Sequence, residues 1–420
     1  MKKNKKETNR SKASSSSTDI IGMGMENNFL PEEITMDILS RLPAESVLKC
    51  QLVCKTWRSL VHDPSFNHMH LLRHQLDDQN AAESSGLLGF IFLTSLSNNE
   101  GRKLCYLRYN KKDEQQQHHP HQTLITRISL HPPAVDDHLI VGSCNGLICI
   151  SINNYSVGVG DPVYICNPIT REYVILPYMD TKLNDRCCLV SGFGYNPSTN
   201  EYKVVRICCS NYEPFAKTVQ VYTLGDGIGW RNKGEIMYKF IHHPRYILGI
   251  LANGALHWLD AEQKIVAFDL VDENFRVLPP PPFLRRLNES NHFELQVFRG
   301  SLCALHYIGD KRMDVWSLKN NINSNYDMKE QGYQFWSWSK EFSSGREVLI
   351  PNQAITLTES GEVLLCYNRS TLFRYDMKTT TSEKLVKLDA SFSSYNAIPH
   401  MNSFVSLKAL GEEDTKIMGS

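Results

Sequence analysis

Residues 145–148 read Asn145-Gly146-Leu147-Ile148, a glycine turn followed by the start of an alternating strand. Asn-Gly is a strong hairpin signal, because both residues tolerate a positive φ angle. The unit recurs three times, as Asn253-Gly254-Ala255-Leu256, Arg299-Gly300-Ser301-Leu302 and Ser360-Gly361-Glu362-Val363. This recurrence predicts a repeat architecture of short antiparallel strands.

A second strand follows each of these units before the pattern starts again. These strands are expected at Val163–Asn167, Ile265–Asp269, Met313–Trp316 and Leu372–Asp376. Repeated sets of three or four short strands are typical of a β-propeller. Six blades over residues 86–410 would take about 54 residues each, close to the roughly 40–50 residues of known blade repeats. A two-sheet sandwich is the alternative, although this segment is large for one.

The end of the chain is expected to close the ring. Ser403-Phe404-Val405-Ser406-Leu407 is interpreted as one more strand, which could return to complete the first blade and leave no open sheet edge. The predicted β domain therefore spans residues 86–410, and residues 411–420 are expected to be a flexible tail.

The segment before the repeats has a helical apolar pattern. Ile34, Ile38 and Leu42 recur every four residues, which is the spacing of one helix face. Because the residue before a proline avoids the α region, Pro43 ends this helix. Further interruptions of the helical apolar pattern predict three or four short helices in a domain of residues 26–76. A core this small is marginal, which favours a partner that helps to bury the apolar stripes.

Two polar segments border the helical domain. Residues 1–25 are basic and rich in serine, so they are expected to be a disordered tail. Their lysines could serve as a nuclear address, although a solvated leader is the preferred interpretation. Residues 77–85 are mostly polar and are expected to be a linker between two modules that fold and bind through separate residues.

The composition disfavours several classes of protein. Among 420 residues, Lys+Arg and Asp+Glu both number 45, so the formal net charge is zero and a globally basic nucleic-acid binder is not expected. No apolar core of about 7–15 residues follows the basic N-terminus, so a secretory signal is not predicted. The longest apolar stretches, such as Leu87–Leu93, are too short to span a bilayer, and no membrane partner is predicted.

The 12 cysteines show neither a C-x-x-C motif nor zinc-ligand spacing. Without a secretion signal, the thiols are expected to be reduced and mostly buried. Cys50 and Cys54 are expected to share one helical face. Neither nucleotide-binding nor hydrolase motifs occur. The sequence therefore predicts no catalytic, metal or cofactor site.

The helical segment resembles an F-box. The similarity rests on an ordered pattern with two Leu-Pro pairs and a V-C-K-x-W run, carried by Leu30, Pro31, Ile34, Ile38, Leu39, Leu42, Pro43, Leu48, Val53, Cys54 and Trp57. F-boxes bind a Skp1-like adaptor and, through it, a cullin. The resemblance therefore implies that these residues contact the Skp1-like partner.

The repeat segment resembles the F-box-associated domain of the large plant F-box families, which is related to kelch propellers. The similar motifs are Gly142–Ile148, Asn167-Pro168-x-Thr170, Phe193-Gly194-Tyr195, Tyr202–Val205 and Asn253–Trp258, without the Gly-Gly doublets of kelch repeats. The resemblance implies a non-catalytic substrate-recognition adaptor of a Skp1–cullin–F-box (SCF) ubiquitin ligase, located in the cytoplasm, the nucleus or both. Its propeller would capture a target protein for ubiquitination and degradation.

Two alternative functions stay open. A propeller enzyme, such as a glycoside hydrolase, would need acidic and arginine residues converging at one end of the channel, and a Skp1-binding protein could act outside a ligase. If the propeller is a receptor, its target should dock on loops, because rigid scaffolds carry recognition on their connections. The candidate segments are Asn154–Asp161, Tyr178–Arg186, Asn211–Ala216 and Pro280–Asn291. The pattern does not indicate which of them share a face.

Overall fold

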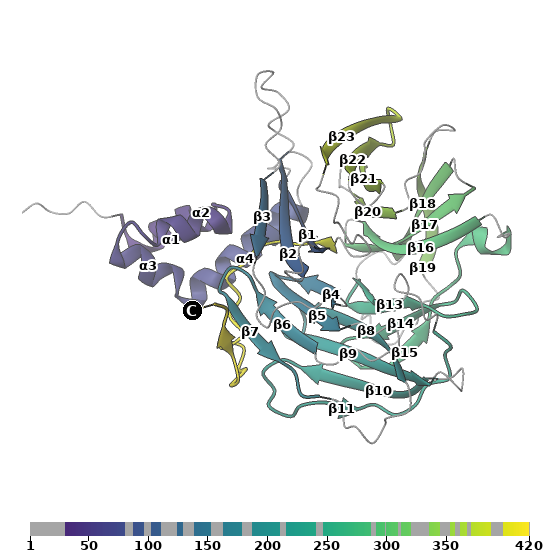
Figure 1. Cartoon of the computed structure of the whole chain (residues 1–420), viewed down its shortest axis with the longest axis horizontal. Helices are drawn as coiled ribbons and strands as arrows, with labels where there is room; N and C mark the ends of the chain where they lie inside the picture. The colour runs from purple at the N-terminus through teal and green to yellow at the C-terminus, as the bar shows by residue number, and fades with distance from the viewer. Residues whose placement is uncertain are drawn as a thin grey trace, which may run out of the picture.

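The chain folds into four short helices followed by a ring of short strands (Figure 1). This computed structural model describes residues 30–79, 87–95, 102–110, 124–128, 138–152, 163–178, 187–210, 216–240, 247–286, 291–298, 300–309, 312–320, 336–344, 353–357, 362–367, 371–387 and 398–419. The predicted organisation, a small helical module and an all-β propeller, is therefore confirmed.

The helical module consists of α1 (Glu32–Ser40), α2 (Ala44–Cys50), α3 (Lys55–Val61) and α4 (Pro64–Gln79). Pro31 and Pro43 stand at the N-caps of α1 and α2, where the backbone is extended and a missing N–H costs little. Cys54 caps α3 by accepting a hydrogen bond from the backbone N–H of Trp57 at 3.4 Å. Cys50 and Cys54 do not share a helical face, because α2 ends at Cys50.

The fourth helix continues further than the apolar pattern indicates. It ends at Gln79 and so includes the first residues of the predicted linker at 77–85. The rest of that linker and the predicted tail at 1–25 lie outside the described residues. None of the described helices is long and apolar enough to cross a membrane.

Six antiparallel sheets form the blades of the propeller. Blade 1 contains β24 (Ile398–Pro399), β1 (Leu87–Ser95), β2 (Arg102–Asn110) and β3 (Leu124–Ile128); blade 2 contains β4 (His138–Cys144), β5 (Leu147–Ile152), β6 (Val163–Asn167), β7 (Glu172–Ile175) and β25 (Lys416–Ile417); blade 3 contains β8 (Cys187–Asn196), β9 (Glu201–Ser210), β10 (Ala216–Thr223) and β11 (Arg231–Asn232). Blade 4 contains β12 (Ile250–Ala252), β13 (Ala255–Leu259), β14 (Ile265–Asp269) and β15 (Phe275–Val277); blade 5 contains β16 (Asn291–Phe298), β17 (Ser301–Ile308), β18 (Arg312–Asn320) and β19 (Trp336–Ser343); blade 6 contains β20 (Gln353–Leu357), β21 (Glu362–Tyr367), β22 (Thr371–Asp376) and β23 (Thr381–Lys387).

The innermost strand of each blade contacts the innermost strand of the next. These contacts run from β4 through β8, β12, β16, β20 and β24 and return to β4. The ring is therefore closed and has the six blades that the repeat pattern predicts.

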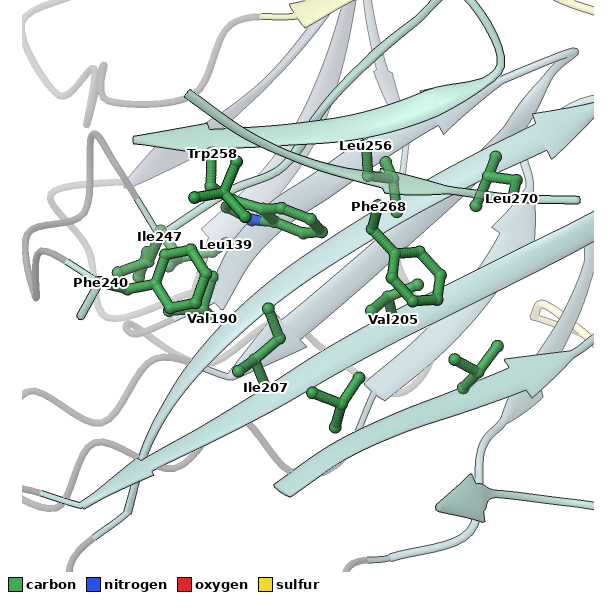
Figure 2. Packing of buried hydrophobic residues seen from close by; sticks show 13 residues of the cluster. Leu139, Val190, Val205, Ile207, Phe240, Ile247, Leu256, Trp258, Phe268 and Leu270 are labelled. Atoms are coloured by element: carbon green, nitrogen blue, oxygen red, sulfur yellow. The ribbon is translucent and has the colours of Figure 1, made fainter. Parts of the chain in front are cut away.

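Apolar side chains fill the space between neighbouring blades. Between blades 3 and 4, Val205 and Ile207 of β9 pack with Trp258 and Phe268, and all four are buried (Figure 2). Successive side chains of a strand point to opposite faces of its sheet. Val204 of β9 accordingly belongs to the cluster that blades 2 and 3 share.

The recurring glycine turns join the innermost strand of a blade to its second strand. Asn145 and Gly146 join β4 to β5, and Asn253 and Gly254 join β12 to β13. The φ angles are 50° at both asparagines, 84° at Gly146 and 73° at Gly254. Only residues that tolerate positive φ fit such turns, which is why this signal in the sequence marks the blades.

The predicted closing strand at Ser403–Leu407 is wrong. Blade 1 is completed instead by β24, in which Ile398 pairs with Ile91 and Pro399 with Phe90. The side chains of Phe404 and Leu407 pack into two different hydrophobic clusters. Residues 403–407 form no strand.

Residues 400–419, called here the C-terminal strap, cross blades 1 to 3 and end against blade 2. Its strand β25 pairs with β7, joining Lys416 to Tyr173 and Ile417 to Glu172. Met418 is buried. The expectation of a flexible tail from residue 411 onward is therefore wrong for residues 411–418, which pack on the propeller.

Candidate partner-binding surfaces

Large apolar side chains are exposed on the helical module. Leu30, Ile34 and Ile38 are 57%, 49% and 45% exposed. Ile34 and Ile38 are four residues apart and so lie on one side of α1, and Leu30 directly precedes the N-cap Pro31. Leu52 and Val53, in the turn between α2 and α3, are 77% and 66% exposed. Exposed apolar groups in such number on one small module mark an interaction surface. These five residues are called here the apolar F-box surface.

The predicted partner contacts fall into three classes of exposure. Leu30, Pro31, Ile34, Ile38 and Val53 are exposed; Leu42, Pro43, Leu48, Cys54 and Trp57 are half-buried; Leu39 is buried. Leu39 belongs to the core, so it supports the surface from beneath and is not available for direct contact. Leu52 is not among the predicted contacts, although it is 77% exposed; it lies in the turn that follows the end of α2 at Cys50.

The inner faces of the helices form one compact core. Leu39, Ala44, Val47, Val61 and Phe66 are buried together, and Leu42, Leu48 and Trp57 pack against them. Trp57 therefore stabilises the module as well as standing at its surface. A change at Trp57 consequently affects folding and partner binding together.

Polar contacts hold α1 against α4. The Asp37 carboxylate accepts hydrogen bonds from Arg73 at 2.6 Å and from Arg41 at 2.7 Å. These bonds, first from Arg73 and then from Arg41, lower the pKa of Asp37. Because Arg73 belongs to α4, the bond fixes the orientation of α1 and with it the exposed Ile34 and Ile38.

The helical module contacts one face of the propeller. Ile169, in the β6–β7 turn of blade 2, packs against the core of the helical module, and so does Phe404 of the strap. Asn402 donates a hydrogen bond from Nδ2 to Oε1 of Glu45 in α2 at 2.6 Å. The helices and the strap lie side by side in Figure 1. The two modules therefore share a hydrophobic core, contrary to the expectation that they fold through separate residues.

The strand order places the strand ends that flank the four candidate target segments on the opposite face. In each antiparallel blade, the first-to-second and third-to-fourth connections lie on one face, which here carries the β4–β5 and β6–β7 turns that meet the strap and the helices. The candidate segments join strand ends on the other face, in the order β5–β6, β7–β8, β9–β10 and β15–β16. Most of these residues lie outside the described ranges. Tyr178, at the described start of one segment, is 67% exposed.

The described part of the fourth candidate segment, Pro280–Asn291, packs against blade 5. Its 3-10 helix η3 (Pro282–Arg286) places Phe283 on His306, with ring centroids 4.1 Å apart and planes at 4°. Beneath it, Asp314 accepts hydrogen bonds from Lys340 at 2.7 Å and from Arg312 at 3.1 Å. Burial alone would raise the pKa of Asp314, but these bonds outweigh it and the pKa is lowered. The base of this loop is therefore charged and fixed.

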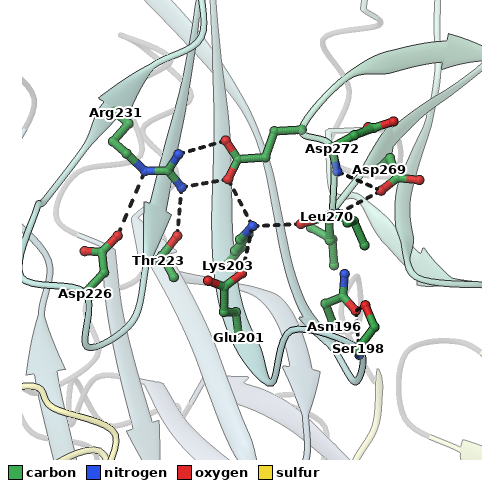
Figure 3. Close-up of polar contacts among 12 residues, drawn as sticks. Asn196, Ser198, Glu201, Lys203, Thr223, Asp226, Arg231, Asp269, Leu270 and Asp272 are labelled. Carbon is green, nitrogen blue, oxygen red and sulfur yellow. Dashed lines mark hydrogen bonds and ion pairs between the residues drawn. The ribbon is translucent and has the colours of Figure 1, made fainter. Parts of the chain in front are cut away.

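A buried ion cluster joins blades 3 and 4 on the helical side (Figure 3). The Glu273 carboxylate lies 3.0 Å from Lys203, 2.7 Å from Arg231 and 2.9 Å from Lys233. Burial opposes ionisation of Glu273, but the hydrogen bonds from these cations prevail and lower its pKa to about 2. A carboxylate neutralised by three cations is suited to structure and not to acid–base catalysis.

The described residues contain no group of three His, Cys, Asp or Glu that could hold a metal ion. The described cysteine side chains are free thiols, and Cys105, Cys149, Cys166, Cys208 and Cys303 are buried. Burial raises the pKa of Cys166 to about 12. A thiol with so high a pKa is a poor nucleophile at neutral pH.

Two family models match the chain, each over one of its modules. An F-box-like model matches residues 28–72, and the model of the F-box associated beta propeller domain matches residues 92–400. The chain belongs to the family of F-box proteins with an F-box-associated β-propeller. This combination supports, in general, the role of a substrate adaptor in SCF ubiquitin ligases, and the F-box implies a partner of the Skp1 type.

Similar curated proteins cover nearly the whole chain. The F-box protein At3g07870 of Arabidopsis thaliana is 30% identical over 86% of this chain and 88% of its own length. The F-box/kelch-repeat protein At3g23880 and the F-box protein CPR1, also from Arabidopsis thaliana, are 27% and 25% identical over 84% and 90% of this chain, covering 92% and 88% of their own lengths. Among solved structures, the oligogalacturonate lyase of Vibrio parahaemolyticus has a TM-score of 0.37 and 9% identity over 74% of this chain and 90% of that one, a likeness too low to carry functional meaning.

Proposed function

We propose that this chain is the substrate-recognition adaptor of an SCF ubiquitin ligase. Its F-box binds a Skp1-like subunit and, through it, a cullin, and its propeller captures a target protein for ubiquitination and degradation. The chain itself is non-catalytic in this assembly, because ubiquitin transfer belongs to other subunits. We place its action in the cytoplasm, the nucleus or both.

The apolar F-box surface carries this proposal. Burying one half-exposed Leu or Ile side chain contributes roughly 1 kcal/mol, since full burial contributes about 1.5–3 kcal/mol. Five such residues contribute on the order of 5 kcal/mol before the cost of association. In a module whose own core is small, an exposed apolar surface of this kind favours contact with another protein.

The arrangement of the two surfaces supports the second half of the proposal. The F-box packs against the blade 2 turns on one face, and the strand ends of the four candidate target segments lie on the other. A target held there would not compete with the Skp1-like subunit for space. A propeller offers its loops as a rigid recognition surface, and this separation is what a bridging adaptor requires.

Titration of the full chain with a purified Skp1-like protein tests the proposal. The double variant Ile34→Asp, Ile38→Asp should weaken binding about 100-fold, since each charge costs at least ~1.4 kcal/mol in a buried contact. The matched control is Ile228→Asp, in the β10–β11 turn, where Ile228 is 69% exposed and remote in sequence from the F-box. Equal affinities for the two variants would overturn the assigned surface.

Co-purification of a cullin separates a ligase adaptor from a Skp1-binding protein that acts outside a ligase. The wild-type chain should recover a cullin when the Skp1-like protein is present, and the double variant should not. Recovery of the Skp1-like protein without any cullin would favour the second role.

A further inference from the structure

Hydrogen bonds with blade 2 hold the C-terminal strap on both sides of Phe404. Nδ2 of Asn167, at the end of β6, donates hydrogen bonds to the carbonyl oxygens of Ser403 at 3.1 Å and Val405 at 2.7 Å. The hydroxyl of Ser403 donates to the carbonyl of Asn145 at 2.5 Å. These bonds fix the backbone on both sides of Phe404, which leaves the direction of that side chain little freedom.

The Glu172 carboxylate extends this clamp along the strap. It accepts hydrogen bonds from the hydroxyl of Ser406 at 2.9 Å and from the backbone N–H of Leu407 at 2.6 Å. Leu407 is fully buried in the cluster between blades 2 and 3. The strap therefore moves with blade 2.

Phe404 extends from this clamped segment into the core of the F-box. It is 5% exposed, and its ring centroid lies 5.9 Å from that of Phe66 and 5.2 Å from that of His70, edge-on to the latter. Phe66 and His70 are both buried residues of α4. One side chain of the propeller strap is thus a structural part of the Skp1-binding module.

We propose that Phe404 is the positioning residue that locks the F-box onto the propeller, so that the apolar F-box surface and the target face move as one body. The proposal rests on the proposed function for its meaning, because an adaptor that bridges two partners determines the distance between them. Two domains joined by a linker usually move relative to each other unless their interface is apolar and well packed. Phe404 and Ile169 supply that apolar contact here, and the polar Asn402–Glu45 bond adds direction to it.

Distances between two labels in the full chain test this inference without any partner. Spin labels on unnatural amino acids at His68 of α4 and Lys378 of the β22–β23 turn, both exposed positions, report the distance from F-box to propeller. The wild-type chain should give one narrow distribution. Phe404→Ala should at least double its width, and Phe404→Leu should restore most of the wild-type width, because it retains an apolar side chain at the contact.

Two further variants separate positioning from general loss of stability. Met418→Ala removes another buried strap residue, in a cluster that the F-box does not join, and should leave the distribution narrow. Asn167→Asp keeps the acceptor for the Ile169 N–H but loses both donors to the strap, so it should broaden the distribution without touching the F-box core. If Phe404→Ala unfolds the F-box, the width measured for Asn167→Asp decides whether the strap positions the F-box on the propeller.

Wild-type width in both Phe404→Ala and Asn167→Asp overturns the inference. Affinity for the Skp1-like protein is measured on the same samples and should change less than about threefold, since the apolar F-box surface does not include Phe404. If even the wild-type chain fails to bind the Skp1-like protein, the proposed function fails, whereas the distance result still decides the role of Phe404.

Discussion

The rings of Phe404 and Phe66 lie 5.9 Å apart, centroid to centroid, although one belongs to the last segment of the chain and the other to α4. Both side chains are buried, and together with Leu39 and Val47 they form one core. The helical module is therefore built from both ends of the chain. A change near the C-terminus consequently reaches the N-terminal domain.

Truncation after Met401 should loosen the helical module more than the propeller ring. Such a chain keeps β24, which closes blade 1, but lacks Phe404 and the strand that pairs with β7. We expect hydrogen exchange to accelerate in α1–α4 and β7 while blades 4 and 5 keep their protection. Truncation after Ala397 also removes β24, opens the ring and should lower the melting temperature further. Unchanged exchange in the helices of the first truncation would contradict the shared core.

Gly146 and Gly254 provide a matched pair for the strap contact. Both have positive φ, but a Cβ at Gly146 would lie 2.2 Å from Oγ of Ser403, whereas Gly254 has open space there. Gly254→Ala should therefore cost only the backbone strain of about 1 kcal/mol. Gly146→Ala should cost about 1–3 kcal/mol more, because the strap must shift. Denaturant unfolding of the two variants measures the difference. Equal losses in the free energy of unfolding would mean that the strap shifts away from the new methyl group at no cost.

Substitutions at Leu52 and Leu39 should separate an effect on partner binding from an effect on folding. Leu52→Asp places a charge on an exposed turn, so we expect an unchanged melting temperature and a loss of affinity for the Skp1-like protein of about tenfold or more. Leu39→Ala leaves a cavity in the core and should destabilise the helical module by about 2–5 kcal/mol. Calorimetry and titration on both variants check this. Normal binding by Leu52→Asp would exclude that turn from the interface.

Acid should weaken the junction of blades 3 and 4. The pKa of Glu273 is about 2 in the folded protein, below the value of 4.5 for an ordinary Glu. Its contribution to stability is therefore fully present above about pH 4.5 and is lost as the pH falls towards 2. Glu273→Gln should destabilise the protein by about 3 kcal/mol at pH 7, since it removes the buried carboxylate beside Lys203 and leaves that ammonium group with the more exposed Glu201.

Chemical denaturation at several pH values checks the role of Glu273. The wild-type chain should lose its advantage over Glu273→Gln as the pH falls from about 4.5 towards 2. Arg276→Gln is the control, because its ion pairs with Asp269 and Asp272 are more exposed and should contribute little. An advantage of the wild-type chain that does not change with pH would show that Glu273 acts through packing alone.

Exchange of the segment at 179–186 should alter target capture and leave Skp1 binding intact. This segment lies between β7 and β8 in the sequence, and the strand ends that flank it are on the face opposite to the helices. The control exchange is the β8–β9 turn at 197–200, on the helical face. Mass spectrometry should show that the set of co-purified proteins differs from that of the wild-type chain for the first exchange only. If both exchanged chains co-purify the same proteins as the wild-type chain, target recognition lies elsewhere.

Local chemistry made much of this protein readable from its sequence. Asn-Gly pairs mark blade turns because few residues accept positive φ, and Pro31 and Pro43 mark helix starts because proline lacks an N–H. Spacing along α1 identified Ile34 and Ile38 correctly as a stripe. Each of these signals depends only on neighbours within a few residues.

Contacts between distant segments were decided only by the tertiary structure. Spacing could not tell that Leu39 is buried while Ile34 is exposed, because that depends on where α4 packs. The two residues of β24 are too few to show periodicity, whereas Ser403–Leu407, interpreted from the sequence as a strand, forms none. Phe404 and Leu407 are drawn into separate cores, one in the F-box and one between blades 2 and 3. Burial of apolar surface is non-directional, so the sequence shows which side chains are apolar, and only the folded chain determines which of them are buried and where.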